Sequence, residues 1–375
     1  MTNTATANLE TRVHAPVKAR QICFFAAFML PMTKLLEAPS NLAKEGLGDL
    51  LLPAVLHFIF QTAILLGLLF LLSKTKGGFF PFLEEKIGRT GLKIFKWCLA
   101  VYFLFAALQP LLDLEKFVHA AFYDTEPNAF SLTPFFFLSG YISVKSLRSF
   151  GRIADLCAPI FLIAFSGLIL MSLGATDLQA VLPWFEFPFS KILTATTRTT
   201  VYFSDVILIL PLLGEFDYKK GDSLKITSSY AVGGLFTLLF LAVFYGIYQS
   251  LAPIEHYAFS KIAQYFPALQ TLGRIDLLLV YALTAVLLFI YSLPIAYACR
   301  FISDGVEGKP VLIAAIINAG LLIFTFFGNR HYNFFYTAIT QKLWWIFPLF
   351  TIAILLFFGI LILFLNRKKE RAYER

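Results

Sequence analysis

The sequence predicts an all-α integral membrane protein of ten transmembrane helices, arranged as two inverted repeats of five. Three observations lead to this prediction. Hydrophobic residues make up 58% of the 375 residues and charged residues only 14%, with a mean hydropathy of +0.75, whereas soluble proteins are roughly a quarter charged. The apolar runs are long and continuous, which favours helices over a barrel of alternating strands. Two of these runs, five apart in order, are interrupted by proline and charged residues.

The number of spans follows from the length of the apolar stretches. A helix needs about 20 residues to cross the hydrocarbon core of a bilayer, and ten stretches meet that length. They lie near residues 21–43, 48–72, 91–112, 129–147, 152–174, 192–215, 226–250, 271–301, 309–328 and 342–366. The predicted domains are a cytoplasmic N-terminal segment (1–20), a membrane domain (21–366) and a basic cytoplasmic tail (367–375).

The basic residues indicate the orientation. Of the 31 Lys and Arg residues, 22 fall in the termini and loops of one side, seven fall on the other side, and Lys34 and Arg198 fall inside spans. Because cytoplasmic loops carry an excess of Lys and Arg, both termini are predicted to be cytoplasmic. The basic loops on the cytoplasmic side, which face anionic lipid headgroups, account for the net charge of +8. We therefore predict no nucleic-acid partner. The outer loop after the third span is acidic, with Asp113, Glu115, Asp124 and Glu126.

The first span is predicted to be broken. It reads FFAAFMLPMTKLLEAPSNLAKEG, with Pro31 and Pro39 flanking Lys34 and Glu37. Each proline removes a backbone N–H group and disfavours helix in the residue before it. We therefore expect unwinding around residues 30–33.

The sixth span is predicted to be broken as well. It reads ILTATTRTTVYFSDVILILPLLGEF. A Thr-rich polar half carries Arg198, Ser204 and Asp205 fall in the middle of the membrane, and the span ends through Pro211 and Gly214.

Interrupted helices at corresponding places in two halves are typical of inverted-repeat transporters. The halves predicted here are residues 21–174 and 190–366, and because five is an odd number the second half enters the membrane from the opposite face. A ligand site is then expected at the two breaks near the midplane. There, freed N–H groups hold a carboxylate and freed carbonyls hold an ammonium group, so an amino acid zwitterion uses both.

Charged residues within spans are candidates for function, since each costs roughly 3 kcal/mol at the bilayer centre. Lys34 and Glu37 either neutralise each other on one helix face or take a gating or coupling role. Arg198 either extends to the interface or takes such a role. Asp205 is a candidate for a role with substrate or proton. His57, alone in the second span, is either a packed neutral histidine or a proton relay.

The sequence contains no pattern typical of an enzyme or a metal site. It has no Walker loop, no HExxH, no GxSxG and no clustered His and Cys set. We therefore predict no catalytic residue, no metal and no cofactor.

Three stretches resemble the spore germination permeases of the GerAB type. They are LEAPSNLAKEGLGDLLLPAVL after the first break, YFSDVILILPLLGEFDYKKG in the sixth span and LGRIDLLLVYALTAVLLFIYSLPIAYA in the eighth. The length, the ten spans and the cytoplasmic termini match this family too. The resemblance implies the LeuT-like fold of the amino acid–polyamine–organocation superfamily. It also implies the B subunit of a nutrient germinant receptor in the inner membrane of bacterial spores.

Such a subunit is expected to bind a small germinant, for example an amino acid, beside an A-type membrane subunit and a C-type lipoprotein. Carried over by position, the resemblance implies a germinant pocket formed by Leu30, Pro31, Met32, Thr33, Tyr202, Phe203, Ser204 and Asp205.

The first break departs from the family pattern. The family has a small Gly-Thr or Gly-Ser pair there, whereas this chain has Pro31-Met32 followed by Thr33. A bulkier break leaves less room for backbone to wrap a carboxylate. Three hypotheses for function therefore stay open: a ligand-binding receptor subunit, an autonomous proton-coupled amino acid transporter, and a structural subunit with a vestigial pocket.

Overall fold

The elements of this protein are helices throughout the part of the chain that the structure describes. This structure is a computed structural model that describes residues 17–75, 77–122, 128–181, 185–264, 275–306 and 308–373. Most of the predicted N-terminal segment 1–20 lies outside these residues, and the predicted tail 367–375 is helical as far as Tyr373.

The first half of the chain, up to residue 181, forms α2 (Ala19–Phe24), the π-helical turn η1 (Phe25–Met29), the 3-10 turn η2 (Leu30–Lys34), α3 (Ala38–Gly46), η3 (Leu47–Asp49), α4 (Leu51–Leu72), α5 (Phe79–Phe122), α6 (Asn128–Ser143), α7 (Leu147–Ser172), η4 (Leu173–Ala175) and η5 (Leu178–Val181). The second half forms α8 (Phe189–Phe203), η6 (Val206–Ile209), α9 (Leu210–Gly214), α10 (Asp222–Tyr248), η7 (Gln249–Leu251), α11 (Ala258–Ala263), α13 (Ile275–Val306), α14 (Pro310–Arg330), α15 (Tyr332–Thr337), η8 (Ala338–Lys342) and α16 (Ile346–Tyr373).

Seven of the described helices are long and apolar enough to cross a membrane, namely α4, α5, α7, α10, α13, α14 and α16, and the bent pair of Ala19–Lys34 with α3 makes an eighth. Two further predicted spans correspond to α6, which is a shorter apolar helix, and to the broken run α8–η6–α9. The prediction of a helical integral membrane protein is thus confirmed. The pairing of ten spans into two inverted repeats stays a prediction.

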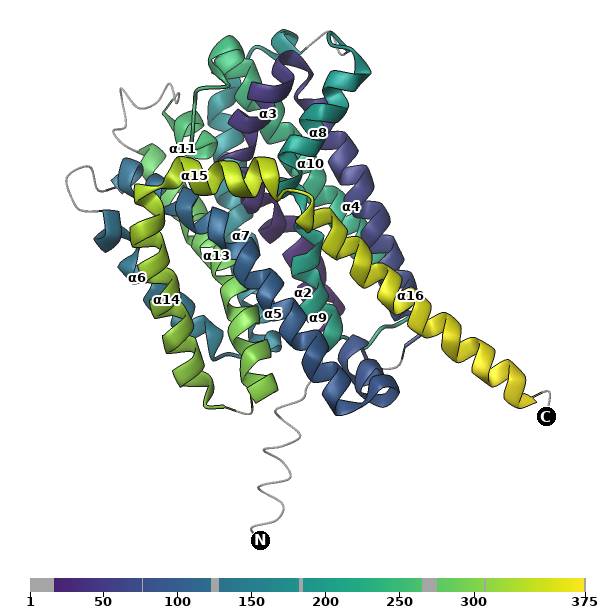
Figure 1. The fold of residues 1–375 in the computed structure, drawn as a ribbon. Coiled ribbons are helices and arrows are strands. Elements are labelled where there is room, and N and C mark those ends of the chain that lie inside the picture. Colours follow the sequence, from purple (N-terminus) through teal and green to yellow (C-terminus); the bar gives the residue numbers. More distant parts are fainter. Residues whose placement is uncertain are drawn as a thin grey trace.

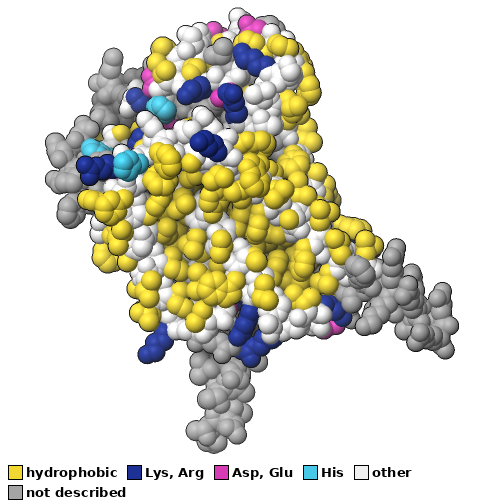
Figure 2. All heavy atoms as spheres, viewed as in Figure 1, with side chains coloured by type: hydrophobic (Ala, Val, Ile, Leu, Met, Phe, Trp, Pro, Cys, Tyr) yellow, Lys and Arg dark blue, Asp and Glu magenta, His cyan; other side chains and the backbone are white. Residues whose placement is uncertain are grey.

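The surface has the distribution of charge that a bilayer requires. Figure 2 shows a broad band of hydrophobic side chains around the middle of the molecule, with the charged side chains gathered above and below it. Helices α3, α8, α11 and α15 lie at the upper end, and α2 and α9 lie toward the lower end (Figure 1). We call these the upper and lower ends; by the distribution of Lys and Arg, the upper end is the predicted outer side.

The first span is broken, a few residues later than predicted. Residues 30–33 keep a helical path in the 3-10 turn η2, and the chain bends by 61° between Lys34 and Ala38. Pro31 has no N–H group to continue the α-helical ladder, which explains the change of helix type. Pro39 lies in the first turn of α3, where a missing N–H group costs nothing.

The sixth span is broken where predicted. Helix α8 ends at Phe203, Ser204 takes non-helical backbone angles (φ −86°, ψ 44°), and the 3-10 turn η6 follows Asp205. The Thr-rich half needs no outside partner, because the hydroxyls donate to carbonyls of the preceding turn, as Thr199 does to Ala195 and Thr200 to Thr196. Such bonds satisfy polar side chains inside a membrane helix.

Candidate functional site

The two breaks are joined by an ion pair between Lys34 of η2 and Asp205, which lies between α8 and η6. The pair is buried, with 1% of the Lys34 side chain and 4% of the Asp205 side chain exposed. Lys34 Nζ also approaches the Thr33 hydroxyl at 3.3 Å, and the Tyr230 hydroxyl of α10 donates to Asp205 Oδ1 at 3.4 Å. Three helical segments that are far apart in sequence therefore meet at one neutralised pair.

Aromatic rings enclose this pair. The rings of Phe58 and Phe203 have their centroids 5.8 and 5.7 Å from Lys34 Nζ, within the range of cation–π attraction. His57 stacks on Phe203 with centroids 4.5 Å apart, and its Nε2 lies 3.1 Å from the Thr199 hydroxyl. His57 is thus packed and hydrogen-bonded, in agreement with the first of its two interpretations.

The first of the two interpretations of Lys34 and Glu37, mutual neutralisation on one helix face, is wrong. Lys34 pairs with Asp205, and Glu37 Oε2 lies 3.0 Å from Nδ1 of His256, in the segment before α11. Residues three apart are neighbours only on a continuous helix, and here the 61° bend between η2 and α3 separates them. Each residue therefore finds its partner on a different element.

An inner cavity of about 80 Å³ lies beside the Lys34–Asp205 pair. Residues of η2, α5, α8, η6, α13 and α16 contribute to its walls, in addition to the break residues Ser204 and Asp205. Four of the eight predicted pocket residues line it, namely Thr33, Tyr202, Ser204 and Asp205. The other four, Leu30, Pro31, Met32 and Phe203, are buried but do not line this cavity.

A larger vestibule of about 590 Å³ lies above the inner cavity. Its walls include the polar residues Glu37, Asn41, Lys116, His256 and Tyr336. They belong to α3, α5, α15 and the segments flanking α3 and α11, at the upper end of the molecule (Figure 1). The vestibule therefore opens toward the predicted outer side.

Hydrogen-bonded side chains connect the walls of the two spaces. Tyr336 donates to Asn41 Oδ1 at 2.6 Å, Asn41 Nδ2 donates to the Tyr202 hydroxyl at 3.0 Å, and Tyr332 donates to Asp113 Oδ1 at 2.9 Å. We call these five residues the tyrosine layer. Asp113 lines both the vestibule and the inner cavity. The tyrosine layer therefore lies where the walls of the two spaces meet.

The carbonyls at the first break are largely occupied, contrary to the expectation that they hold an ammonium group. The Leu35 and Leu36 carbonyls accept from the backbone N–H groups of Phe259 and Ala258 in α11. The Glu37 carbonyl accepts from the Ser40 hydroxyl at 3.1 Å and the Asn41 amide at 2.8 Å, and the Leu30 carbonyl from the Thr33 hydroxyl at 2.7 Å. The bend exposes these oxygens, and the protein itself satisfies them.

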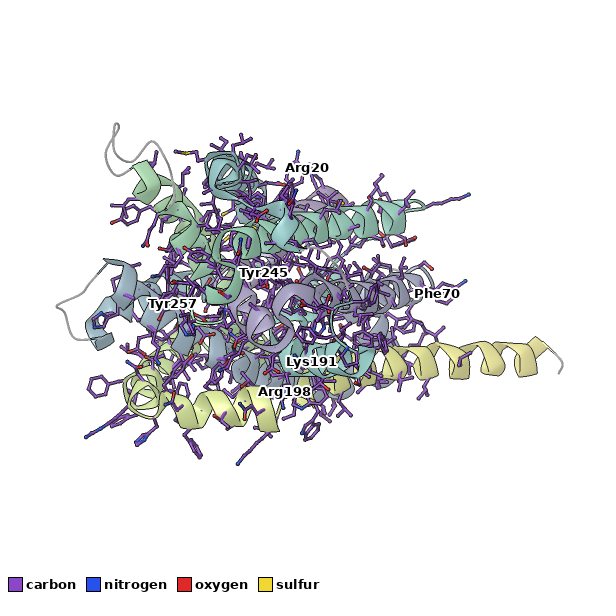
Figure 3. All side chains as sticks on the ribbon, turned by 90° about the horizontal axis from the view of Figure 1, so that it is seen from above. Arg20, Phe70, Lys191, Arg198, Tyr245 and Tyr257 are labelled. Atoms are coloured by element: carbon purple, nitrogen blue, oxygen red, sulfur yellow. The ribbon has the colours of Figure 1, made fainter. Side chains whose placement is uncertain are left out.

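Arg198 lies away from the inner cavity. Its side chain is 59% exposed, and its guanidinium pairs with Glu45 of α3 at 3.0 Å. Seen from above (Figure 3), it lies on the side of the molecule where α8 contacts η8 and α16. This position fits a residue that extends to the interface, which was one of its two interpretations.

Sequence reasoning missed Asp113 as a site residue, because it ended the third span at residue 112 and assigned Asp113 to an outer loop. Helix α5 in fact continues to Phe122, and Asp113 is 3% exposed. A signal was present: Gln109 and Asp113 are four apart, the spacing of a hydrogen-bonded pair on one helix face. The partners Asn41, Tyr332 and Tyr336 come from distant segments and left no such signal.

Comparison with known protein families gives a match. The model of a family described as spore germination protein, the spore permeases, matches residues 35–334, which is well over half of the chain. The matched region contains the bend of the first span, all of α8 to α14 and the tyrosine layer up to Tyr332. No curated protein matches the sequence.

Proposed function

This chain belongs to the spore germination protein family, and we propose that it is the membrane subunit of a nutrient germinant receptor that binds a small germinant in the inner cavity. The family supports a role in spore germination for a multi-pass, transporter-like membrane protein, and it is not a family of enzymes. An amino acid is the class of germinant that we propose. Binding is proposed to trigger germination.

The observation that carries this proposal is the meeting of two broken helices at a buried ion pair beside a small cavity. Intramembrane ionisable residues are costly and are kept where a pathway or ligand uses them. The inner cavity of about 80 Å³ is well below the roughly 300–1,000 Å³ of sites for drug-sized ligands. The size supports a small solute, and the polar vestibule supports its entry from the predicted outer side.

The architecture and setting belong to the same proposal. We propose that the ten spans form two inverted repeats related by the broken first and sixth spans, as the family resemblance implies. The protein then acts in the inner membrane of the spore with both termini cytoplasmic, beside an A-type membrane subunit and a C-type lipoprotein. Co-purification of these two partners with the tagged chain from spore membranes is the expected result.

A cavity-filling substitution tests the binding site. Ala106 of α5 lines the inner cavity, so Ala106→Leu adds volume without touching the Lys34–Asp205 pair. We expect spores that carry it to lose germination in response to the amino acid that triggers the wild type. Ala353→Leu, on an exposed position of α16, is the matched control and leaves the response intact. A normal response in the Ala106→Leu spores would contradict the location of the site.

An autonomous transporter is the second candidate, because an inner cavity between two broken helices, next to a polar vestibule, also suits alternating access. Proteoliposomes that contain only this chain distinguish the two functions. The receptor proposal predicts binding of amino acids without accumulation inside the vesicles. Uptake that depends on a proton gradient and is abolished by Ala106→Leu would establish transport instead.

A further inference from the structure

Asp113 is a buried carboxylate at the boundary between the vestibule and the inner cavity. We propose that it binds the ammonium group of the germinant and thereby restricts the receptor to compounds that carry a primary amine. This inference rests on the proposed function and specifies which chemical group of the germinant the receptor recognises. Asp113 is then a specificity-determining residue.

The geometry places the Asp113 carboxylate where an entering solute meets it. The side chain is 3% exposed and lines both spaces. Its oxygens accept from two neutral donors, Gln109 Nε2 at 3.2 Å and the Tyr332 hydroxyl at 2.9 Å. These donors orient the carboxylate and leave lone pairs for further donors.

Asp113 forms no ion pair with a described basic residue. Among the neighbouring charges, Lys34 neutralises Asp205, and His256 lies against Glu37. Lys116, one turn further along α5, places its Nζ 3.1 Å from the centroid of the Tyr332 ring. Of the two carboxylates that line the inner cavity, Asp205 and Asp113, the first forms an ion pair and the second forms none with the basic residues that the structure describes.

Four backbone carbonyls near the first break already accept hydrogen bonds. The carbonyls of Leu30, Leu35, Leu36 and Glu37 each accept a hydrogen bond from the protein. An ammonium group must replace its water hydrogen bonds when it enters a buried site. Charge-assisted hydrogen bonds to a carboxylate replace them best. Among the described residues, the Asp113 carboxylate lines the inner cavity without forming an ion pair.

The carboxylate of the germinant should contribute less to binding in the inner cavity than its amine. The walls of the inner cavity contain one neutralised pair and one carboxylate that forms no ion pair among the described residues, so a cationic group of the ligand fits its charge. Its remaining walls are mainly apolar, as at Ile290, Pro294 and Phe347, and accept a short apolar side chain. An amino acid amide should therefore bind, and a simple carboxylic acid should not.

The test uses the purified full-length chain in nanodiscs and isothermal titration calorimetry. The probes are glycine, L-alanine, glycinamide, L-alaninamide, acetate and propionate. We expect the four amine-bearing probes to bind and the two acids to bind at least tenfold more weakly or not at all. Asp113→Asn, which keeps an acceptor for Tyr332, is expected to lower the affinity for the amine-bearing probes by roughly 10- to 100-fold.

Glu115→Gln is the matched control, because Glu115 is a carboxylate on the same helix turn that is hydrogen-bonded to Asn329 at 3.3 Å and does not line the inner cavity. We expect it to change the affinities less than about twofold. If Asp113→Asn does not fold, Asp113→Glu keeps the charge and should retain the preference for amines. The wild-type ranking of alanine against propionate is decisive even without a variant.

The outcomes separate this inference from the proposed function. Binding of propionate as tightly as alanine, or equal affinities for wild type and a folded Asp113→Asn, would overturn the role of Asp113 and leave the receptor function standing. Failure of all six probes to bind would overturn both. Selective loss of the amine-bearing probes in Asp113→Asn supports both.

Discussion

Ion pairs in this protein are either buried or exposed, and the two kinds differ in the free energy of unfolding that is lost when they are broken. The Lys34–Asp205 pair is almost completely buried, whereas Arg198–Glu45 at the upper end leaves 59% of the arginine side chain exposed. Exposed pairs contribute about 0–1 kcal/mol. Breaking a buried pair leaves an uncompensated charge and costs about 3–5 kcal/mol. The first pair should therefore control folding and conformation, and the second should matter little.

A double-mutant cycle on the buried pair tests this difference. We expect Lys34→Met alone to destabilise the protein by about 3–5 kcal/mol, because Asp205 loses its cation. Lys34→Met combined with Asp205→Leu should recover much of that loss, since neither charge is then buried. The measurement is thermal or denaturant unfolding in detergent. The cycle Arg198→Gln with Glu45→Gln is the control, and coupling there as strong as in the buried pair would contradict this account.

The contact between His256 and Glu37 should depend on pH. The hydrogen bond to Glu37 raises the pKa of His256 above its ordinary value, Asp113 raises it further, and partial burial and Lys116 oppose the shift. Because the folded pKa is raised, the contact stabilises most below about pH 6.5, the value for an unperturbed histidine. The stabilisation is lost as the pH rises through the folded pKa.

The measurement is the difference in Tm between wild type and His256→Gln as a function of pH. We expect the wild type to be more stable at about pH 6 and the difference to vanish in alkaline solution, with a size below about 1 kcal/mol because the histidine side chain is 60% exposed. Glu37→Gln should remove the same pH dependence. A difference that grows with pH would show that the contact favours the neutral histidine.

At the scale of elements, the first span is shaped by its neighbour α10 as well as by proline. A Cβ atom added at Gly233 of α10 would come within 2.6 Å of the Ala26 carbonyl and 3.3 Å of Pro31 Cγ. The π-helical turn η1 contains Ala26, and η2 contains Pro31. Only a glycine lets the two backbones approach this closely, so the irregular turns and the close packing depend on each other.

Substitution of Gly233 tests that dependence. We expect Gly233→Ala to cost about 1–3 kcal/mol, because the contact is with backbone and cannot be relieved by a change of rotamer. Gly320→Ala is the control: it lies in α14, where an added Cβ meets nothing within 4 Å. That change should be neutral or stabilise by up to about 1 kcal/mol, since alanine favours helix. Equal Tm values for the two variants would contradict the close approach.

At the scale of the whole molecule, the apolar band and the two charged ends define how the protein lies in the bilayer (Figure 2). Lys44 of α3 and Lys191 of α8 are exposed at the upper end. Lys220 is exposed in the segment between α9 and α10 toward the lower end. The excess of basic residues on the lower side predicts that this side is cytoplasmic.

Labelling with a membrane-impermeant maleimide tests the orientation. The background is a variant in which Cys23, Cys98, Cys157 and Cys299 are replaced by alanine. Lys191→Cys should react in intact cells, and Lys220→Cys should react only after the membrane is permeabilised. Labelling of Lys220→Cys alone in intact cells would mean that the chain is inserted the other way round.

Sequence alone determined that this is a helical membrane protein. Membrane insertion depends on composition, on the length of apolar stretches and on the positions of proline and charged residues, which are all local properties of the sequence. The sequence located both breaks to within a few residues and selected Lys34 and Asp205. It did not pair them, because the partner of a buried charge is decided by which helices meet. Tertiary structure decided that Lys34 pairs with Asp205 and Glu37 with His256. It also decided that α11 donates hydrogen bonds to carbonyls of the first break. Asp113, predicted to lie in a loop, lies at the boundary between two cavities. The physical reason is that every charge and backbone polar group inside a membrane must find a partner, and which partner it finds depends on packing between distant segments.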